Sequence, residues 1–102
     1  MNVFYDNGDY LYSWDDNKEK KNRRKHWVTF KEAITVFDDD DALYKSDPDH
    51  SQDEERFIII GRSARDNLLV VCHCYRENDA VIRIISARKA TSMESIEYGG
   101  RL

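Results

Sequence analysis

The 102-residue sequence has few residues of the kinds that interrupt or cross-link a chain: 4 glycines, 1 proline and 2 cysteines. Cys72, His73 and Cys74 follow one another in an apolar run, without the second ligand pair that a zinc site needs. We therefore expect buried reduced thiols and a core or edge histidine with its hydrogen bonds satisfied. No apolar run approaches the roughly 20 residues of a membrane helix, and no signal peptide precedes the acidic N-terminus. These absences predict a soluble, cytoplasmic protein without a membrane partner.

Positive charge is scarce overall, since 16 lysines and arginines face 20 acids and the net charge is −4. This balance argues against general nucleic-acid affinity, but the cations gather in residues 18–26 and the acids in residues 38–55. A chain divided in this way can bind a polyanion on one side. The acidic run Asp38 to Asp41 lacks the spacing of a calcium loop, so we expect a solvated surface, with no metal site and no cofactor.

Turn and capping residues predict the N-terminal elements. The Asn7-Gly8 pair between two apolar runs predicts a hairpin of strands 3–5 and 10–14. Asp15 or Asp16 can cap a helix that ends near His26 and has almost no apolar face. A second helix is expected over 30–37, and a short helix over 92–98, because each follows the threonine and glutamate spacing of a capping box.

Runs of β-branched residues predict a three-stranded antiparallel meander of strands 57–63, 68–75 and 80–90, with a short strand at 42–45 and an exposed loop over 46–53. In the last strand, Val81, Arg83, Ile85 and Ala87 should share one face. Both faces of this strand are largely apolar, so we expect both to be covered and the strand to be central. Arg83 on a dry face is either half of an ion pair with an acid such as Glu55, or part of a site for phosphate or an antagonist.

The order of these elements predicts an α+β fold over residues 1–102: a single domain with an antiparallel sheet, two N-terminal helices and one short C-terminal helix. Residues 1–9 are expected to be an extension or a hairpin strand.

Several short motifs occur together in the chain: Trp14-Asp15-x-x-Lys18, Lys25-His26, Phe30-x-Glu32-Ala33, Val36-Phe37-x-Asp39, Glu55-Arg56, Gly61-Arg62-Ser63 and Arg83-Ile-Ile-Ser-Ala-Arg88-Lys-Ala. In this order, over roughly residues 10 to 98, they resemble the BrnT toxins of bacterial type II toxin–antitoxin systems. The chain departs from the usual pattern at Trp27, where the family commonly has glycine.

The resemblance implies a RelE-like fold and an endoribonuclease that arrests growth by cutting RNA. It also implies neutralisation by a BrnA-like antitoxin with a ribbon-helix-helix domain, in a heterotetramer that contacts DNA only through the antitoxin.

RNA cleavage without a metal needs a base for the 2′-hydroxyl proton, cations for the phosphorane and an acid for the 5′-oxygen. The forked guanidinium groups of two arginines suit the phosphate, a histidine suits proton transfer, and a glutamate could orient an arginine or act as base. The expected catalytic residues are His26, Arg62, Arg83 and Glu55. The expected RNA-binding residues are Lys21, Arg24, Lys25 and Arg88. Strand register is not fixed by sequence, so whether Arg62 and Arg83 share a face stays open.

The alternative is a non-catalytic interaction module whose basic helix and arginines bind an acidic partner. Convergence of His26, Arg62 and Arg83 on one concavity would favour the enzyme, and arginines locked to buried carboxylates would favour the module. A DNA-binding repressor acting alone is a weaker third interpretation, because no helix has the form of a paired recognition helix.

Overall fold

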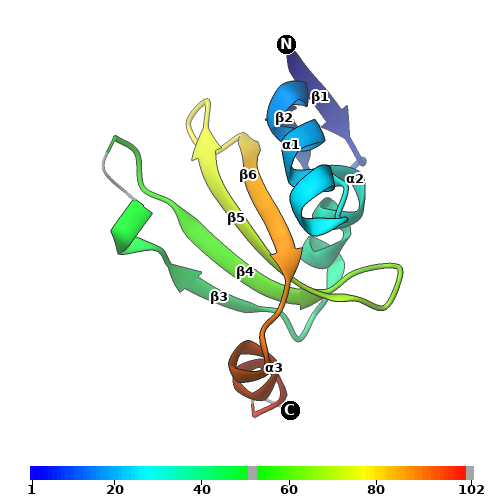
Figure 1. Cartoon of the computed structure of the whole chain (residues 1–102). Helices are drawn as coiled ribbons and strands as arrows, with labels where there is room; N and C mark the ends of the chain where they lie inside the picture. Colours follow the sequence, from blue (N-terminus) through cyan, green and yellow to red (C-terminus); the bar gives the residue numbers. More distant parts are fainter. Residues whose placement is uncertain (51–52, 101–102) are drawn as a thin grey trace.

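The computed structural model describes residues 1–50 and 53–100, which form a mixed six-stranded sheet with three α-helices and two short 3-10 helices (Figure 1). The strands are β1 (Asn2–Asp6), β2 (Leu11–Asp15), β3 (Leu43–Ser46), β4 (Phe57–Arg62), β5 (Leu68–Arg76) and β6 (Val81–Lys89). The helices are α1 (Asp16–His26), α2 (Phe30–Ala33), η1 (Ile34–Asp38), η2 (Pro48–His50) and α3 (Ser92–Gly99). The expected α+β class is confirmed.

The strand order is β1-β2-β6-β5-β4-β3, so β6 is an interior strand, as predicted. The meander β4-β5-β6 is antiparallel, and so are β1-β2 and β3-β4. β2 and β6, however, run parallel, with Ser13 opposite Arg83. The expectation of an antiparallel sheet is therefore wrong at this one pair. The N-terminal hairpin adds to the sheet beside β6, on the side opposite β5. No turn joins β2 directly to β6, so no local sequence signal sets their relative direction.

The first residues of the chain form an edge strand of the sheet. β1 pairs along its length with β2, and Val3 packs against the main core. The connecting turn is closed by Asn7 N–H donating to the Tyr10 carbonyl, and Gly8 has φ +95°. Gly8 is thus the residue that supplies the positive φ angle of the predicted hairpin turn.

A register shift interrupts the alternation of β6. Cys72 lies opposite Ser86 but the next residue of β5, His73, lies opposite Ile84, which leaves Ile85 as the extra residue of a bulge. An extra residue reverses the parity of side chains beyond it. Ile84 and Ala87 consequently both face the main core, and the prediction that Ala87 shares a face with Arg83 is wrong.

The two faces of the sheet are covered to different extents. The core face carries Tyr12, Leu69, Val71 and Ile84, against which α2 and η1 pack. We call the opposite side the open face. It carries Ser13, Arg83 and alternate residues of β5, namely Val70, Cys72, Cys74 and Arg76. It is covered at one end by α3, where Tyr98 packs on Ile60 and Val70. The expectation that both faces of β6 are covered is therefore met only in part, since most residues on the open face of this strand are half-buried.

Helix α1 is fixed to the sheet by a buried amide and not by an apolar stripe. Asn22 Nδ2 donates to the carbonyls of Ala87 at 2.8 Å and Val28 at 3.1 Å, and Asn22 Oδ1 accepts from Ala87 N–H at 3.0 Å. The side chain thus pairs with β6 beyond the point where β2 stops. Asp15 caps the helix as predicted, by accepting from Lys18 N–H.

The two predicted capping boxes differ in the structure. Thr91 and Glu94 form both hydrogen bonds of the box at the start of α3. Thr29 caps α2, but the buried carboxylate of Glu32 accepts from Ser63 Oγ and Asn67 Nδ2 instead of closing the box. Glu32 thereby connects α2 to the β4–β5 turn. Among the described residues, no helix combines the length and hydrophobicity that a membrane crossing requires.

Candidate functional site

The open face gathers arginines that lie far apart in the sequence. Arg83 of β6 is opposite Cys74 of β5, and Arg76 extends from β5 on the same face. Arg88 returns to this face because the Ile85 bulge reverses the parity of β6. The three arginines of this face therefore extend from two neighbouring strands, and a rigid strand fixes the position of a side chain better than a loop does.

Arg83 is bound by neutral oxygens. Its Nη1 donates to Ser13 Oγ at 3.3 Å and its Nη2 to Asn2 Oδ1 at 3.0 Å. No carboxylate of the described residues hydrogen-bonds to this guanidinium, so the interpretation of Arg83 as half of an ion pair with Glu55 is wrong. Burial and the neighbouring Arg76 lower the pKa of Arg83, while Asp15 opposes this shift. The positive charge of Arg83 is thus held in place by two neutral hydrogen-bond acceptors, and no carboxylate of the described residues neutralises it by direct contact.

Arg76, which the sequence reasoning missed, is paired with Glu54 on the open face. Arg76 Nη2 lies 2.8 Å from Glu54 Oε1, and this hydrogen bond lowers the pKa of Glu54. The signal that could have found Arg76 is its spacing, because it follows Cys72 and Cys74 at steps of two along one strand.

Arg88 is held by α3 through two parallel hydrogen bonds. Its Nη1 and Nη2 lie 2.7 and 2.8 Å from the two carboxylate oxygens of Glu94. These bonds lower the pKa of Glu94 to about 2. Arg88 therefore anchors the C-terminal helix, and it is also one of the residues that line a cavity on the open face.

Arg62 shares the open face with Arg83 but lies at the other end of it. Its guanidinium is 5.9 Å from the centre of the Tyr98 ring and pairs with Asp66 at 3.5 Å. Arg62 lies opposite Leu68 of β5, whereas Arg83 lies opposite Cys74 of the same strand. Six residues along a strand correspond to about 20 Å, so the two arginines do not meet at one phosphate.

His26 ends α1, whereas the start of the helix is near Arg83, since Asp15 contributes to the charge environment of that arginine. A helix of this length spans roughly 16 Å, so His26 is not beside Arg83. Lys21, Arg24 and Lys25 are exposed along the same helix. The three predicted catalytic residues His26, Arg62 and Arg83 therefore do not converge, and the basic residues of α1 form a flank of the sheet.

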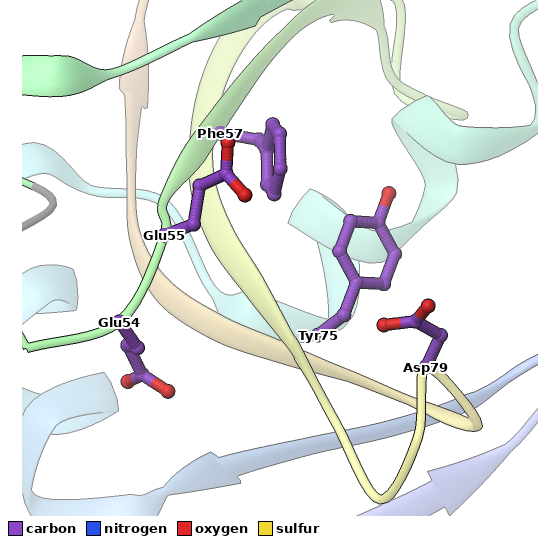
Figure 2. Close-up of a pocket in the computed structure, with 5 residues that line it drawn as sticks. All are labelled: Glu54, Glu55, Phe57, Tyr75 and Asp79. Carbon is purple, nitrogen blue, oxygen red and sulfur yellow. The ribbon is translucent and has the colours of Figure 1, made fainter.

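Glu55 lies on the other side of the sheet from Arg83. It lines a cavity of about 470 Å³ with Phe57, Tyr75, Asp79 and Glu54. Figure 2 shows Glu55 next to Phe57, with Tyr75 and Asp79 across from them and Glu54 directed away. The ring centres of Phe57 and Tyr75 are 5.5 Å apart. This cavity is acidic and aromatic, which does not suit a phosphate.

A second cavity, of about 230 Å³, opens on the face that carries the arginines. Its lining includes two arginines and a histidine: Arg56, Arg88 and His50, together with Asp47, Ile58, Val70, Cys72, Ile85 and Ser86. His50 was not among the predicted site residues, because its loop was interpreted only as an exposed connection.

The remaining titratable groups of the apolar run are the two cysteines and His73. Both cysteines are free, as predicted, but only Cys74 is buried, whereas Cys72 is half-buried and lines the smaller cavity. Burial, followed by Asp47, raises the pKa of Cys72 to about 11. His73 is fully buried, its Nδ1 is 3.2 Å from the Val71 carbonyl, and burial lowers its pKa. The prediction of a satisfied core histidine is confirmed.

The acidic run is partly structural. Asp39 Oδ2 accepts from Arg62 N–H at 2.8 Å and from Tyr98 Oη at 2.7 Å, so it joins η1 to β4 and α3. Over residues 1–50 and 53–100, no three His, Cys, Asp or Glu side chains are placed to hold a metal ion together.

Comparison with known proteins gives one family and one described structure. A family model for "Ribonuclease toxin, BrnT, of type II toxin-antitoxin system" matches residues 14–94. The fold is similar to the crystal structure of the Brucella abortus ribonuclease toxin BrnT, with a TM-score of 0.56 and 22% identity, over 78% of this chain and 94% of that one. The comparison with curated proteins gives no match.

Proposed function

Because the chain belongs to the BrnT family of ribonuclease toxins of type II toxin–antitoxin systems, we propose that it is an endoribonuclease that cuts RNA by metal-independent attack of the 2′-hydroxyl. Cleavage arrests growth until the antitoxin binds. The proposal includes the RelE-like classification of the fold, a single toxin domain over residues 1–102 with residues 1–9 as a hairpin strand, and a cytoplasmic location.

The observation that carries the proposal is the state of Arg83. A half-buried guanidinium bound only to the neutral oxygens of Ser13 and Asn2, among the described residues, retains its charge for an incoming anion. Burial strengthens the interaction of this charge with a phosphate, because the effective dielectric constant is lower than in water. A forked donor set matches the oxygens of a phosphate. We therefore place Arg83 at a phosphate of the bound RNA.

The cations around Arg83 give RNA a path across the molecule. Arg88 lies farther along β6, and Lys21, Arg24 and Lys25 flank the strand from α1. Phosphate contacts of this kind position the backbone without reading sequence. For His26, Arg62 and Glu55, catalytic roles stay predictions, and their distance from Arg83 argues against contact with the same phosphate.

The rival interpretation, a non-catalytic interaction module, is supported by the pairing of other arginines. Arg76 with Glu54 and Arg88 with Glu94 are ion pairs of the kind that such a module would use for structure. Arg83 does not follow this pattern, which is why we favour the enzyme.

A ribonuclease toxin of a type II system has an antitoxin partner and an RNA substrate. We propose that the antitoxin is a BrnA-like ribbon-helix-helix protein in a heterotetramer with the toxin, and that DNA is bound only through the antitoxin. Co-expression of the adjacent small gene should then relieve toxicity, and the purified complex should have the mass of two copies of each chain.

The decisive experiment is expression of the chain alone in bacteria, followed by an RNA cleavage assay with purified protein in EDTA. We expect growth arrest, cleavage that survives chelation, and products with 2′,3′-cyclic phosphate and 5′-hydroxyl ends. Normal growth with abundant soluble protein and no cleavage would refute the toxin. Activity abolished by EDTA and restored by magnesium would refute the metal-independent route.

A further inference from the structure

The open face contains a histidine that is oriented by a carboxylate. His50 Nδ1 lies 3.0 and 3.1 Å from the two carboxylate oxygens of Asp47. With Nδ1 engaged, Nε2 is on the side of the ring that points away from Asp47. The His50 side chain is 67% exposed, whereas that of Asp47 is 13% exposed. A partly buried carboxylate thus holds an accessible imidazole in one orientation, and it favours the tautomer with hydrogen on Nδ1.

The backbone around this pair fixes its position relative to the sheet. Asp47 N–H donates to the carbonyl of Arg56, just before β4, and His50 N–H donates to the carbonyl of Asp47 across η2. Cys72 Sγ of β5 lies 3.9 Å from Asp47 Oδ2. Two contacts, one from the residue before β4 and one from β5, therefore seat the loop on the open face.

The pair shares the 230 Å³ cavity with Arg56 and with Arg88, whose guanidinium is also paired with Glu94. A proton acceptor and two cations around one cavity are the groups that cleavage of a phosphodiester by its own 2′-hydroxyl requires. The other two histidines do not have this setting, since His73 is fully buried and His26 ends α1.

We propose that His50, oriented by Asp47, is the general base of RNA cleavage; the inference rests on the proposed ribonuclease function. Nε2 of His50 takes the proton of the 2′-hydroxyl, the 2′-oxygen forms a bond to phosphorus, and the bond from phosphorus to the 5′-oxygen breaks. Water protonates the departing 5′-oxygen. The products are a 2′,3′-cyclic phosphate and a 5′-hydroxyl, and Asp47 acts as a positioning residue that does not touch the RNA.

The test compares four variants of the full chain: His50→Gln, His50→Gly, Asp47→Asn and the control Asp49→Asn. Asp49 belongs to the same 3-10 turn, so its substitution makes the same change of charge beside His50. The substrate is a labelled single-stranded RNA that contains every dinucleotide step, and binding is measured with its uncleavable 2′-O-methyl form. Thermal melting checks that each variant is folded.

We expect His50→Gln to lower kcat by about 10² to 10⁴-fold with RNA affinity unchanged, as for loss of a general base. Asp47→Asn should lower kcat at least about tenfold with KM unchanged, because the imidazole loses its orienting carboxylate. Asp49→Asn should retain wild-type rates. Added imidazole should restore part of the activity of His50→Gly, a rescue that a structural role would not give.

The pH–rate profile gives a further readout. The charged and titratable groups that face His50 are Asp47 and Asp49 on its own loop, Asp53, Glu54 and Arg56 before β4, Cys72 on β5 and Arg88 on β6. The rising limb of the wild-type profile, which reports loss of the proton from the base, should disappear in His50→Gln and persist in Asp49→Asn.

Two outcomes overturn the inference, and they are distinct from failure of the proposed function. Wild-type cleavage with an equally active, folded His50→Gln excludes His50 as base while the ribonuclease stands. Loss of RNA affinity in His50→Gln without imidazole rescue of His50→Gly assigns His50 to binding instead. Absence of RNA cleavage by the wild-type protein refutes the ribonuclease itself, and the inference with it.

Discussion

Replacement of Arg83 by methionine tests whether this guanidinium serves function or stability. Methionine keeps much of the side-chain volume and removes the charge. The loss is two hydrogen bonds, to Ser13 and Asn2, from a half-buried donor, and each contributes roughly 1 kcal/mol. The gain is relief of the burial and of the repulsion from Arg76 that lower the pKa of Arg83. Because these terms have opposite sign, we expect the free energy of unfolding to change by less than about 1 kcal/mol.

The alternative role predicts a much larger effect. If Arg83 neutralised a buried carboxylate, the same substitution would leave that charge unpaired and destabilise the protein by roughly 3–5 kcal/mol. For a domain of this size, 1 kcal/mol corresponds to about 4–8 °C in Tm. A functional role for Arg83 therefore predicts a Tm change of less than about 8 °C, whereas a structural role predicts a drop of more than about 12 °C.

Thermal melting and single-turnover RNA cleavage should be measured on the same purified Arg83→Met protein. Cleavage should fall about a hundredfold or more, the scale for losing one preorganised charge donor. Arg65→Met is the matched control, since Arg65 is exposed in the β4–β5 turn, and we expect it to change neither quantity. A large drop in Tm with activity retained in the folded fraction would refute the reasoning.

Three further substitutions test the structure. Trp27 ends α1 with φ 60° and is 85% exposed, so Trp27→Gly should raise the free energy of unfolding by about 1 kcal/mol, measured by denaturant titration. Asn22→Ala should lower it by about 3 kcal/mol, because the buried backbone groups of Ala87 lose their partner. Glu94→Gln should cost about 1–2 kcal/mol at pH 7 after allowance for solvent screening of Arg88. Since Arg88 holds the pKa of Glu94 at about 2, below its ordinary 4.5, this difference should persist above pH 5 and vanish as the pH falls towards 2. Equal melting of Glu94→Gln and wild type at pH 7 would contradict it.

The elements that local signals describe were predictable from sequence. Asp15, Thr29 and Thr91 each cap the helix that their spacing predicts. The runs of β-branched residues mark β4, β5 and β6, because a pleated strand suits those side chains. The second predicted helix continues as a 3-10 segment from Ile34, which moves the boundary but keeps the stripe buried.

The arrangement of side chains on β6 was not predictable, because the bulge at Ile85 depends on pairing with β5. A strict period of two places Ala87 with Arg83, and one extra residue separates them. The same bulge brings Arg88 onto the face of Arg83. Two parts of the candidate site thus follow from a register that no local sequence pattern specifies.

The docking of α1 was also hidden, because the helix lacks an apolar stripe. Its polar composition indicates a solvated helix, and only a partner in β6 explains why Asn22 is buried. Asp47 and His50 were missed for a related reason. The two residues are three positions apart in a polar loop, and such a composition predicts an exposed connection. Only the contacts of Asp47 with Arg56 and Cys72 show that the loop lies on the sheet.

The division of charge between the two faces explains how an acidic chain can present a site for RNA. Glu55 and Asp79 line the cavity on the core side, and Asp39 is used to join η1, β4 and α3. On the open face, Glu54 is paired with Arg76 and Glu94 with Arg88. A phosphate that approaches this face therefore meets paired carboxylates, whose negative charge is largely compensated, and the unpaired charge of Arg83. Since interactions between exposed charges are screened beyond about 10 Å at ordinary ionic strength, the local balance on this face governs phosphate binding more than the net charge of −4.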